Sequence, residues 1–303
     1  MRSKIVYMGT PEYAKVILNS LLKDKSFDVN LVLTQPDKPV GRKKILTPPP
    51  VKELALKEDI EIFQPTTLKS KEVVEKIKSK KPDFIVVAAY GIILPREILD
   101  IAPCINLHAS LLPKYRGASP VQEAILNGDR FSGVTAMLME EGLDSGDMLS
   151  FSYIKLNDKI RVDELMERLS ILAGDLIVDT LKSFSSLKPL AQIDATASYC
   201  KKIKRGDGLV SFDLSAEEIY RRFRAFYGWP EIFLDSGLKL KEIDLADEVG
   251  SSGEILKVNK NSIIVGCKSG SIEIKELQPK GKKVMSAKAY LVGRGLKVGD
   301  KIY

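Results

Sequence analysis

Three polar residues in the first half of the chain have the types and spacing for acyl-transfer chemistry. Asn106 and His108 lie two residues apart at the end of an apolar run, CINLH. If this run is a strand, both side chains point to the same face. Each can donate a hydrogen bond, and His108, the single histidine, can also exchange a proton near neutral pH. Asp144 follows in the glycine-flanked loop EEGLDSGD, from which its carboxylate can orient the imidazole.

These residues suit the transfer of a one-carbon acyl group to an amine. An oxyanion develops when the amine attacks the formyl carbon, and Asn106 and His108 can donate to it. Removal of one such donor typically costs about 3–4 kcal/mol of transition-state stabilisation. The amine must lose a proton and the leaving nitrogen must gain one, through His108, Asp144 or a held water. The sequence leaves this proton path open, and each residue alone is more typical of an ordinary turn, core or loop position.

Alternating apolar runs and helical stretches predict the scaffold for these residues. Strands are expected at KIVYM, VNLVLT, IEIFQP, DFIVVAAYG, CINLHA and VTAMLME, with helices near 51–58, 70–80, 95–100, 119–127 and 161–183. This α/β alternation is typical of a doubly wound, mostly parallel, Rossmann-like sheet, here over residues 1–188. Ligands bind beyond the carboxyl ends of such strands, which is where CINLH ends.

The rest of the chain predicts a second, smaller domain. Residues 189–208 lack periodicity and end in a basic cluster, so we expect an inter-domain linker there. One helix near 215–226 is followed by short β runs between turns. Residues 209–303 are therefore expected to form a small antiparallel, OB-like β-barrel.

Composition limits the class of protein. The net charge is +7, and residues 189–303 hold 20 Lys and Arg against 15 Asp and Glu, most of the excess. This balance permits a polyanionic partner without establishing one. The three cysteines are far apart and show no metal or redox spacing, and no apolar run could span a bilayer. We expect a cytoplasmic protein without a metal site or membrane partner.

A long proline-rich connection, TQPDKPVGRKKILTPPPVK, occupies residues 34–52. Loops of this length inside an α/β unit tend to be functional or mobile. Its centre carries three adjacent cations, Arg42, Lys43 and Lys44, which suit an anionic partner.

The ordered motifs NLHASLLPKYRGASP and GLDSGD resemble the folate-dependent formyltransferase superfamily. The resemblance implies that Asn106, His108 and Asp144 are catalytic, and that no covalent enzyme intermediate forms, so that Cys104 only packs. It also implies a site for the formyl donor, 10-formyltetrahydrofolate, as co-substrate. Its expected residues are Ser110, Leu111, Leu112, Pro113, Tyr90 and Gly91.

Further motifs are similar to the methionyl-tRNA formyltransferase family along essentially the whole chain. They are MGTPEYA, TQPDKPVGRKK with PPPVK, FQP, AAYGIILP, YCKKI, YGWP and GLKVGDKIY. This resemblance implies a monomer that formylates the amino group of methionine on initiator tRNA for translation initiation. Residues 209–303 would then bind tRNA, since Lys and Arg contacts to phosphates supply much of nucleic-acid affinity. The expected tRNA contacts are Arg42, Lys43, Lys44, Lys204 and Arg205.

Three alternatives remain open from the sequence. Another amine formyltransferase, acting on a nucleotide sugar or a purine precursor, would share the three polar residues but should lack the 34–52 loop and the basic barrel. A formyl-folate hydrolase would use the same residues with water in place of the amine. An RNA-binding module without catalysis would have no need of Asn106, His108 and Asp144 together.

If the basic residues bind RNA, the affinity for tRNA should fall steeply as salt rises, because binding releases counterions. Arg42→Ala should weaken binding and reduce the slope of log affinity against log salt by about one. Titration of labelled tRNA at several salt concentrations measures both effects. A flat salt response would remove the electrostatic argument.

Overall fold

The computed structural model describes residues 2–41 and 43–303, which form two compact units. Unit 1 comprises Met1–Pro120, Phe131–Lys155 and Leu165–Cys200. Unit 2 comprises Val121–Arg130, Leu156–Glu164 and Lys201–Tyr303. The sequence predicted a linker over residues 189–208, whereas the structure groups this stretch with unit 1 up to Cys200 and with unit 2 from Lys201. Residues 190–200 lack an apolar face, and side-chain hydrogen bonds order them instead, which no periodicity could indicate.

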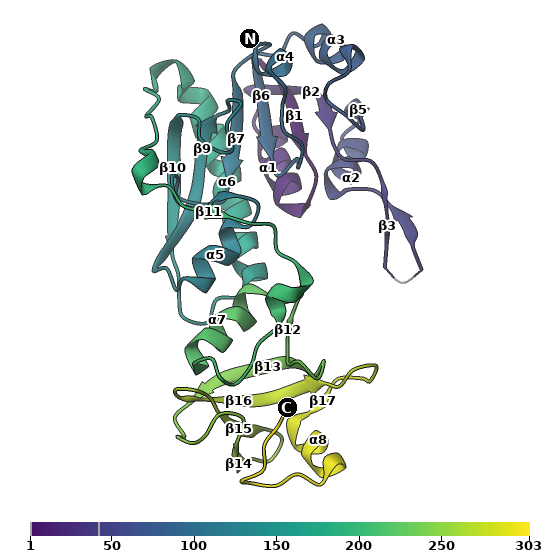
Figure 1. Ribbon diagram of the computed structural model, residues 1–303. Coiled ribbons are helices and arrows are strands. Elements are labelled where there is room, and N and C mark those ends of the chain that lie inside the picture. Colours follow the sequence, from purple (N-terminus) through teal and green to yellow (C-terminus); the bar gives the residue numbers. More distant parts are fainter. Residues whose placement is uncertain (1, 42) are drawn as a thin grey trace. The chain divides into compact units, whose positions relative to one another are not determined.

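A seven-stranded sheet forms the centre of unit 1, in the order β10-β9-β7-β6-β1-β2-β5 (Figure 1). Its strands are β1 (Ser3–Gly9), β2 (Phe27–Leu33), β5 (Ile62–Phe63), β6 (Phe84–Ala88), β7 (Cys104–His108), β9 (Phe131–Leu138) and β10 (Met148–Lys155). The first five run parallel to one another, and β9 runs antiparallel to both of its neighbours, β7 and β10. The predicted Rossmann-like, mostly parallel sheet is confirmed. The sequence reading missed β10, an edge strand.

Helices cover both faces of this sheet, as the alternation of its side chains shows. Val6 and Met8 of β1 belong to a core cluster with Val73 and Ile77 of α3 (Lys71–Ser79). Tyr7 points to the opposite face, where its hydroxyl donates a hydrogen bond to the Ala14 carbonyl of α1 (Glu12–Lys23), 2.5 Å away. Since successive side chains of a strand point to opposite faces, α1 and α3 lie on opposite sides.

The remaining helices of the first 200 residues agree with the predicted positions to within about two residues. They are α2 (Pro50–Lys57), α4 (Arg96–Leu99), α5 (Pro120–Leu126) and α6 (Val162–Ser183). No helix in the described part of the chain is both long enough and apolar enough to cross a membrane.

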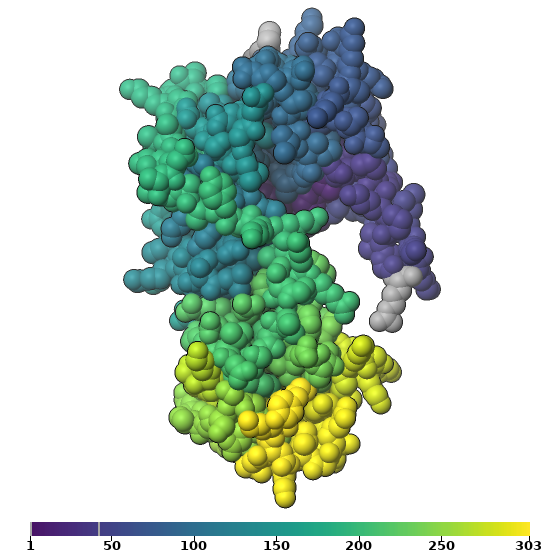
Figure 2. Space-filling view, in the orientation of Figure 1, coloured from purple at the N-terminus to yellow at the C-terminus, as the bar shows by residue number. Residues whose placement is uncertain are grey.

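The proline-rich connection contains a hairpin that the sequence reading missed. Strands β3 (Lys38–Val40) and β4 (Ile45–Thr47) pair in antiparallel register, and the hairpin projects from the surface of unit 1 (Figure 2). Val40, Ile45 and Leu46 are exposed on it although they are apolar. Its strands have only three residues each, too few to show a periodicity in the sequence.

Unit 2 contains an antiparallel sheet in the order β12-β13-β16-β15-β14, with β17 paired to β16. Its strands are β12 (Ile232–Phe233), β13 (Lys239–Ala246), β14 (Ile255–Val258), β15 (Ile263–Gly266), β16 (Ser271–Gln278) and β17 (Met285–Ser286). The predicted helix is α7 (Ala216–Ala225), which begins with a capping box formed by Ser215 and Glu218. A second helix, α8 (Ala287–Arg294), was not predicted. The small antiparallel architecture is confirmed, as a sheet whose path has open ends at β12 and β14.

Core packing in unit 1 gives a stability prediction. Ile85 lies in β6 and has no exposed surface, so Ile85→Ala should lower the free energy of unfolding by about 2–5 kcal/mol. Ile171→Ala removes the same atoms from an exposed position on α6 and should change it by less than about 1 kcal/mol. Denaturant unfolding followed by circular dichroism compares the two variants. Equal effects would contradict the described packing.

Candidate active site

Strand β7 places Asn106 and His108 at the middle of the unit 1 sheet. Asn106 pairs with Val87 of β6 on one side and Met137 of β9 on the other. His108, two residues on, is opposite Thr135 of β9. With neighbouring strands on both sides, the two side chains are presented by a rigid backbone at the carboxyl end of the parallel strands, as predicted.

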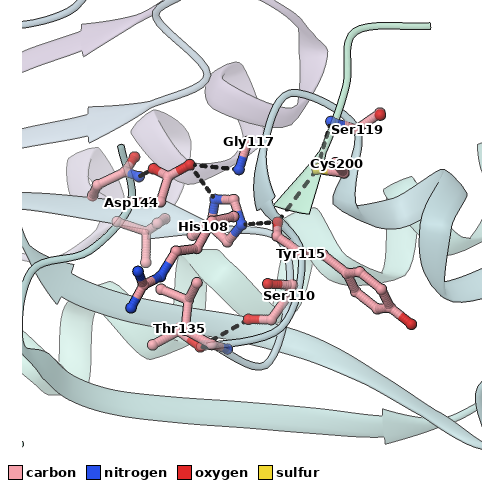
Figure 3. Close-up of polar contacts among 12 residues, drawn as sticks. His108, Ser110, Tyr115, Gly117, Ser119, Thr135, Asp144 and Cys200 are labelled. Carbon is pink, nitrogen blue, oxygen red and sulfur yellow. Dashed lines mark hydrogen bonds and ion pairs between the residues drawn. The ribbon is translucent and has the colours of Figure 1, made fainter. Parts of the chain in front are cut away.

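Asp144 lies in the loop between β9 and β10, and its carboxylate points towards His108 and Gly117 (Figure 3). Its Oδ1 accepts a hydrogen bond from Asn106 Nδ2 at 3.4 Å, and Oδ2 accepts one from the Gly117 backbone N–H at 2.9 Å. Oδ2 also lies 3.6 Å from His108 Nδ1. The structure thus brings the three predicted catalytic residues together, with Asp144 between the other two.

The other imidazole nitrogen of His108 is held by the backbone. Nε2 lies 2.9 Å from the carbonyl oxygen of Tyr115, which can only accept a hydrogen bond, so Nε2 carries a hydrogen. Nδ1 then faces the Asp144 carboxylate. The ring is only 6% exposed, so solvent weakly screens an interaction between these two groups.

The loop after β7 is anchored by a residue that sequence reasoning missed. Thr135 Oγ1 donates to the Ser110 carbonyl at 2.8 Å and accepts from the Leu112 N–H at 3.1 Å. Ser110 Oγ donates to the Lys114 carbonyl at 2.6 Å. The hydroxyl groups of Ser110 and Thr135 are therefore used to fix the loop. Thr135 gave no signal in the sequence, since it lies within an apolar strand pattern.

The segment Ser110–Pro113, predicted to bind the folate donor, follows directly from His108. Ser110 and Leu112 are buried, whereas Leu111 and Pro113 are partly exposed. The partly exposed pair gives this loop an apolar surface next to the three polar residues. Its role in binding the donor stays a prediction.

Tyr90 and Gly91 occupy the turn after β6. The Tyr90 side chain is buried in the core cluster, and burial raises the pKa of its hydroxyl to about 12. Its carbonyl accepts hydrogen bonds from Thr10 Oγ1 and Gln35 Nε2, both at 3.3 Å. Gly91 is exposed with φ +83°, a backbone conformation that favours glycine. Only Gly91 of this pair therefore has an open surface for a ligand.

Cys104, at the start of β7, lies in the apolar core as predicted. Burial raises the pKa of its thiol to about 12, with a smaller contribution from Asp100. The thiol is therefore protonated at neutral pH and is a poor nucleophile.

Arg116 is a buried residue beside the site. It is 3% exposed, and its guanidinium donates from Nε to Gln192 Oε1 at 3.0 Å and from Nη2 to Asp194 Oδ1 at 2.8 Å. Burial lowers the pKa of Arg116, but the hydrogen bonds and charges of Asp194 and Tyr199 together outweigh it, and the net shift is upward. Arg116 belongs to the motif NLHASLLPKYRGASP, whereas Gln192 and Asp194 lie in the stretch predicted to be a linker and gave no signal in the sequence.

Gly117 allows the close approach that this site needs. It has φ +124°, and a Cβ at this position would lie 2.3 Å from the Cys200 carbonyl oxygen. Strand β11 (Tyr199–Cys200) pairs there with β8 (Arg116–Gly117). Any larger residue would separate these strands and move the N–H that Asp144 accepts.

The expected tRNA contacts lie on exposed segments of both units. Lys43 and Lys44 are exposed at the turn of the hairpin in unit 1, and Arg42 lies outside the described residues. Lys204 and Arg205 are exposed in unit 2, beside a short 3₁₀ turn (Arg205–Gly208). Their exposure is compatible with phosphate contacts, which stay a prediction. Among the residues at 2–41 and 43–303, no group of three or more metal-ligating side chains is found.

Sequence comparisons identify both halves of the chain. The family described as "Formyl transferase" matches residues 1–181, and the family described as "Formyl transferase, C-terminal domain" matches residues 202–295. The "Methionyl-tRNA formyltransferase" of Nitratiruptor sp. is 56% identical over 99% of this chain and 100% of its own length. That of Sulfurovum sp. is 54% identical over 100% of both chains.

Among solved structures, HypX from Aquifex aeolicus in complex with tetrahydrofolic acid has a TM-score of 0.64 and 16% identity. The match covers 100% of this chain and 51% of that protein, so this chain corresponds to about half of HypX. At this identity the likeness concerns the fold alone.

The geometry predicts that His108→Ala strongly lowers the rate of formyl transfer. The substitution removes the only imidazole and should lower this rate by about 10²–10⁴-fold, the usual contribution of a general acid or base. Binding of tRNA should stay nearly intact. As a control, Cys104→Ala truncates a buried side chain on the same strand and should keep the rate within about threefold. An equal loss of tRNA binding in His108→Ala would mean that His108 is structural.

Proposed function

The chain belongs to the methionyl-tRNA formyltransferase family, and on that basis we propose that it formylates the methionyl group of an initiator tRNA. It is a formyl-transferring enzyme, and the proposed donor is 10-formyltetrahydrofolate as co-substrate. The proposed product is N-formylmethionyl-tRNA for translation initiation. The observation that carries the proposal is the joint contact of Asn106 and His108 with the Asp144 carboxylate in a full-length relative of these enzymes.

A folate as donor is supported by the family and by the loop at Ser110–Pro113. This loop adjoins His108, and its hydrogen bonds to Thr135 hold its backbone in place. A donor bound along the apolar side of Leu111 and Pro113 would present its formyl group towards Asn106 and His108. HypX, with a related fold, was solved with tetrahydrofolic acid.

Asn106 is the proposed donor to the oxyanion. Its amide has two N–H bonds, of which one is directed to Asp144 Oδ1, so that the second is available to a substrate oxygen. His108 Nε2 is bonded to the Tyr115 carbonyl, so its contribution to the oxyanion is the positive charge of its protonated ring.

His108 and Asp144 together are the proposed acid–base pair. As the methionine nitrogen attacks, a C–N bond forms, the carbonyl π electrons move to oxygen, and the nitrogen loses a proton. His108 accepts this proton at Nδ1, and the Asp144 carboxylate stabilises the resulting imidazolium. The C–N bond to the carrier then breaks as the oxyanion collapses, and the proton passes to the leaving nitrogen. The Gly117 N–H keeps Oδ2 in place during both transfers.

A tRNA as acceptor is supported by the relatives' name and by exposed basic residues on each unit. The hairpin carries Lys43 and Lys44 beside exposed apolar side chains, and unit 2 carries Lys204 and Arg205. Cations of this kind bind phosphates and position an RNA without reading its sequence. We propose that the protein acts in the cytoplasm as a monomer, where charged initiator tRNA is its macromolecular partner.

The direct test is formyl transfer from 10-formyltetrahydrofolate to methionyl-initiator tRNA, with free methionine as control. We expect N-formylation of the charged tRNA and none of the free amino acid, because only the tRNA reaches the basic residues. Mass spectrometry of the aminoacyl group measures both. Turnover of the folate with unmodified tRNA would keep the formyl-transfer class and assign another acceptor, or water.

A further inference from the structure

The stretch 190–200 packs against the candidate active site of unit 1 and is paired with it at both ends. Leu190 pairs with Met148 of β10 through two backbone hydrogen bonds, both 2.9 Å long. Tyr199 and Cys200 pair with Arg116 and Gly117 at its other end. The middle of the stretch thus lies between the Arg116 segment and the Asp144 loop, and its side chains can act on both.

Gln192 makes three hydrogen bonds that join these two segments. Its Nε2 donates to the carbonyl oxygen of Asp144 at 2.9 Å and to that of Gly146 at 2.8 Å. Its Oε1 accepts from Arg116 Nε at 3.0 Å. The partners fix the orientation of the amide, since carbonyls only accept and a guanidinium only donates. Both amide hydrogens are therefore used on the loop that carries Asp144.

The Asp144 loop needs such an anchor because its backbone conformation is unusual. Asp144 has φ +50°, in the left-handed region that L-residues rarely adopt. Two residues on, a Cβ at Gly146 would lie 1.9 Å from the Leu138 carbonyl oxygen, so the loop turns back tightly against β9. A turn of this kind is stable only where surrounding contacts hold it. The bonds from Gln192 are directed to the carbonyls on both sides of this turn.

We propose that Gln192 is a positioning residue, which holds the Asp144 backbone so that the carboxylate meets Asn106, Gly117 and His108. It touches no reacting atom and acts through Asp144. Arg116 acts one step further away, because its buried guanidinium holds Gln192 Oε1 and is itself held by Asp194. This inference deepens the proposed function and rests on it, since it assigns Gln192 to the same acid–base pair.

Two variants with side chains of nearly the same size distinguish the bond of Gln192 to Arg116 from its bonds to the Asp144 loop. Gln192→Glu keeps an acceptor for Arg116 and forms an ion pair with it, but it places an oxygen against the carbonyls of Asp144 and Gly146. Gln192→Met removes the bonds on both sides. If the bonds to the Asp144 loop matter, both variants lose function. If Gln192 only braces Arg116, Gln192→Glu retains it.

Steady-state kinetics give the first measurement. We expect kcat to fall by about 10- to 100-fold in both variants, the usual effect of a catalytic group displaced by about 1 Å. The KM for the charged tRNA and for the folate should change by less than about threefold, because neither substrate contacts Gln192 in this account. Thermal unfolding of each variant confirms that the protein remains folded.

The single histidine allows a second measurement. Its result should stay unchanged if Gln192 only supports Arg116. All imidazole signals in a nitrogen-15 NMR spectrum come from His108, with no need for assignment. We expect the Nδ1 signal to shift in both variants, since the Asp144 carboxylate moves away from it. The matched control is Gln278→Met in unit 2, where the lost bond from Gln278 Nε2 to the Lys282 carbonyl is 2.8 Å long. It should leave both kcat and the His108 signals unchanged.

An unchanged kcat in folded Gln192→Glu would overturn the proposal, as would lower thermal stability with unaltered His108 signals. The NMR result decides the positioning role even if the wild-type protein fails to formylate methionyl-tRNA. Failure of the inference and failure of the proposed function are therefore distinguishable.

Discussion

The carboxylate of Asp144 is the group on which the geometry of the site depends. It accepts hydrogen bonds from the Asn106 amide of strand β7 and from the Gly117 backbone N–H, and it lies 3.6 Å from Nδ1 of the His108 imidazole. Asn106 and His108 belong to β7 and Gly117 to the segment after it, so the position of the carboxylate follows from how β7, this segment and the β9–β10 loop are fixed. Within this part of unit 1, Thr135 fixes the loop after β7, and the Gly117 N–H donates a hydrogen bond to the Asp144 carboxylate.

Backbone atoms contribute as much to this arrangement as side chains. The Tyr115 carbonyl determines which nitrogen of His108 carries a hydrogen, and the Gly117 N–H holds one oxygen of Asp144. Both belong to a short segment that is paired with Tyr199 and Cys200, about 80 residues later in the chain. A preorganised site of this kind needs little rearrangement as charge develops during the reaction.

The scaffold and the three polar residues could be predicted because each leaves a local signal. Largely apolar runs revealed β1, β2, β6 and β7, and the spacing of Asn106 and His108 on such a run indicated a shared face. Gln192 and Thr135 left no such signal. Their roles come from hydrogen bonds to backbone atoms, at Asp144 and Ser110, that are 48 and 25 residues away in the chain. The hairpin strands β3 and β4 are too short to show a pattern. Helix α8 follows a series of turn residues, so its start left no clear signal in the sequence.

In the proposed mechanism His108 exchanges its proton at Nδ1, and the nitrogen-15 spectrum of the unliganded wild-type protein tests this most directly. At a pH where the ring is neutral, we expect the hydrogen on Nε2, directed to the Tyr115 carbonyl, and none on Nδ1. One-bond nitrogen–hydrogen coupling identifies the protonated atom. A neutral ring with its hydrogen on Nδ1 would contradict the account, because Nε2 would then face a carbonyl without a proton to donate and could not be held as the structure has it.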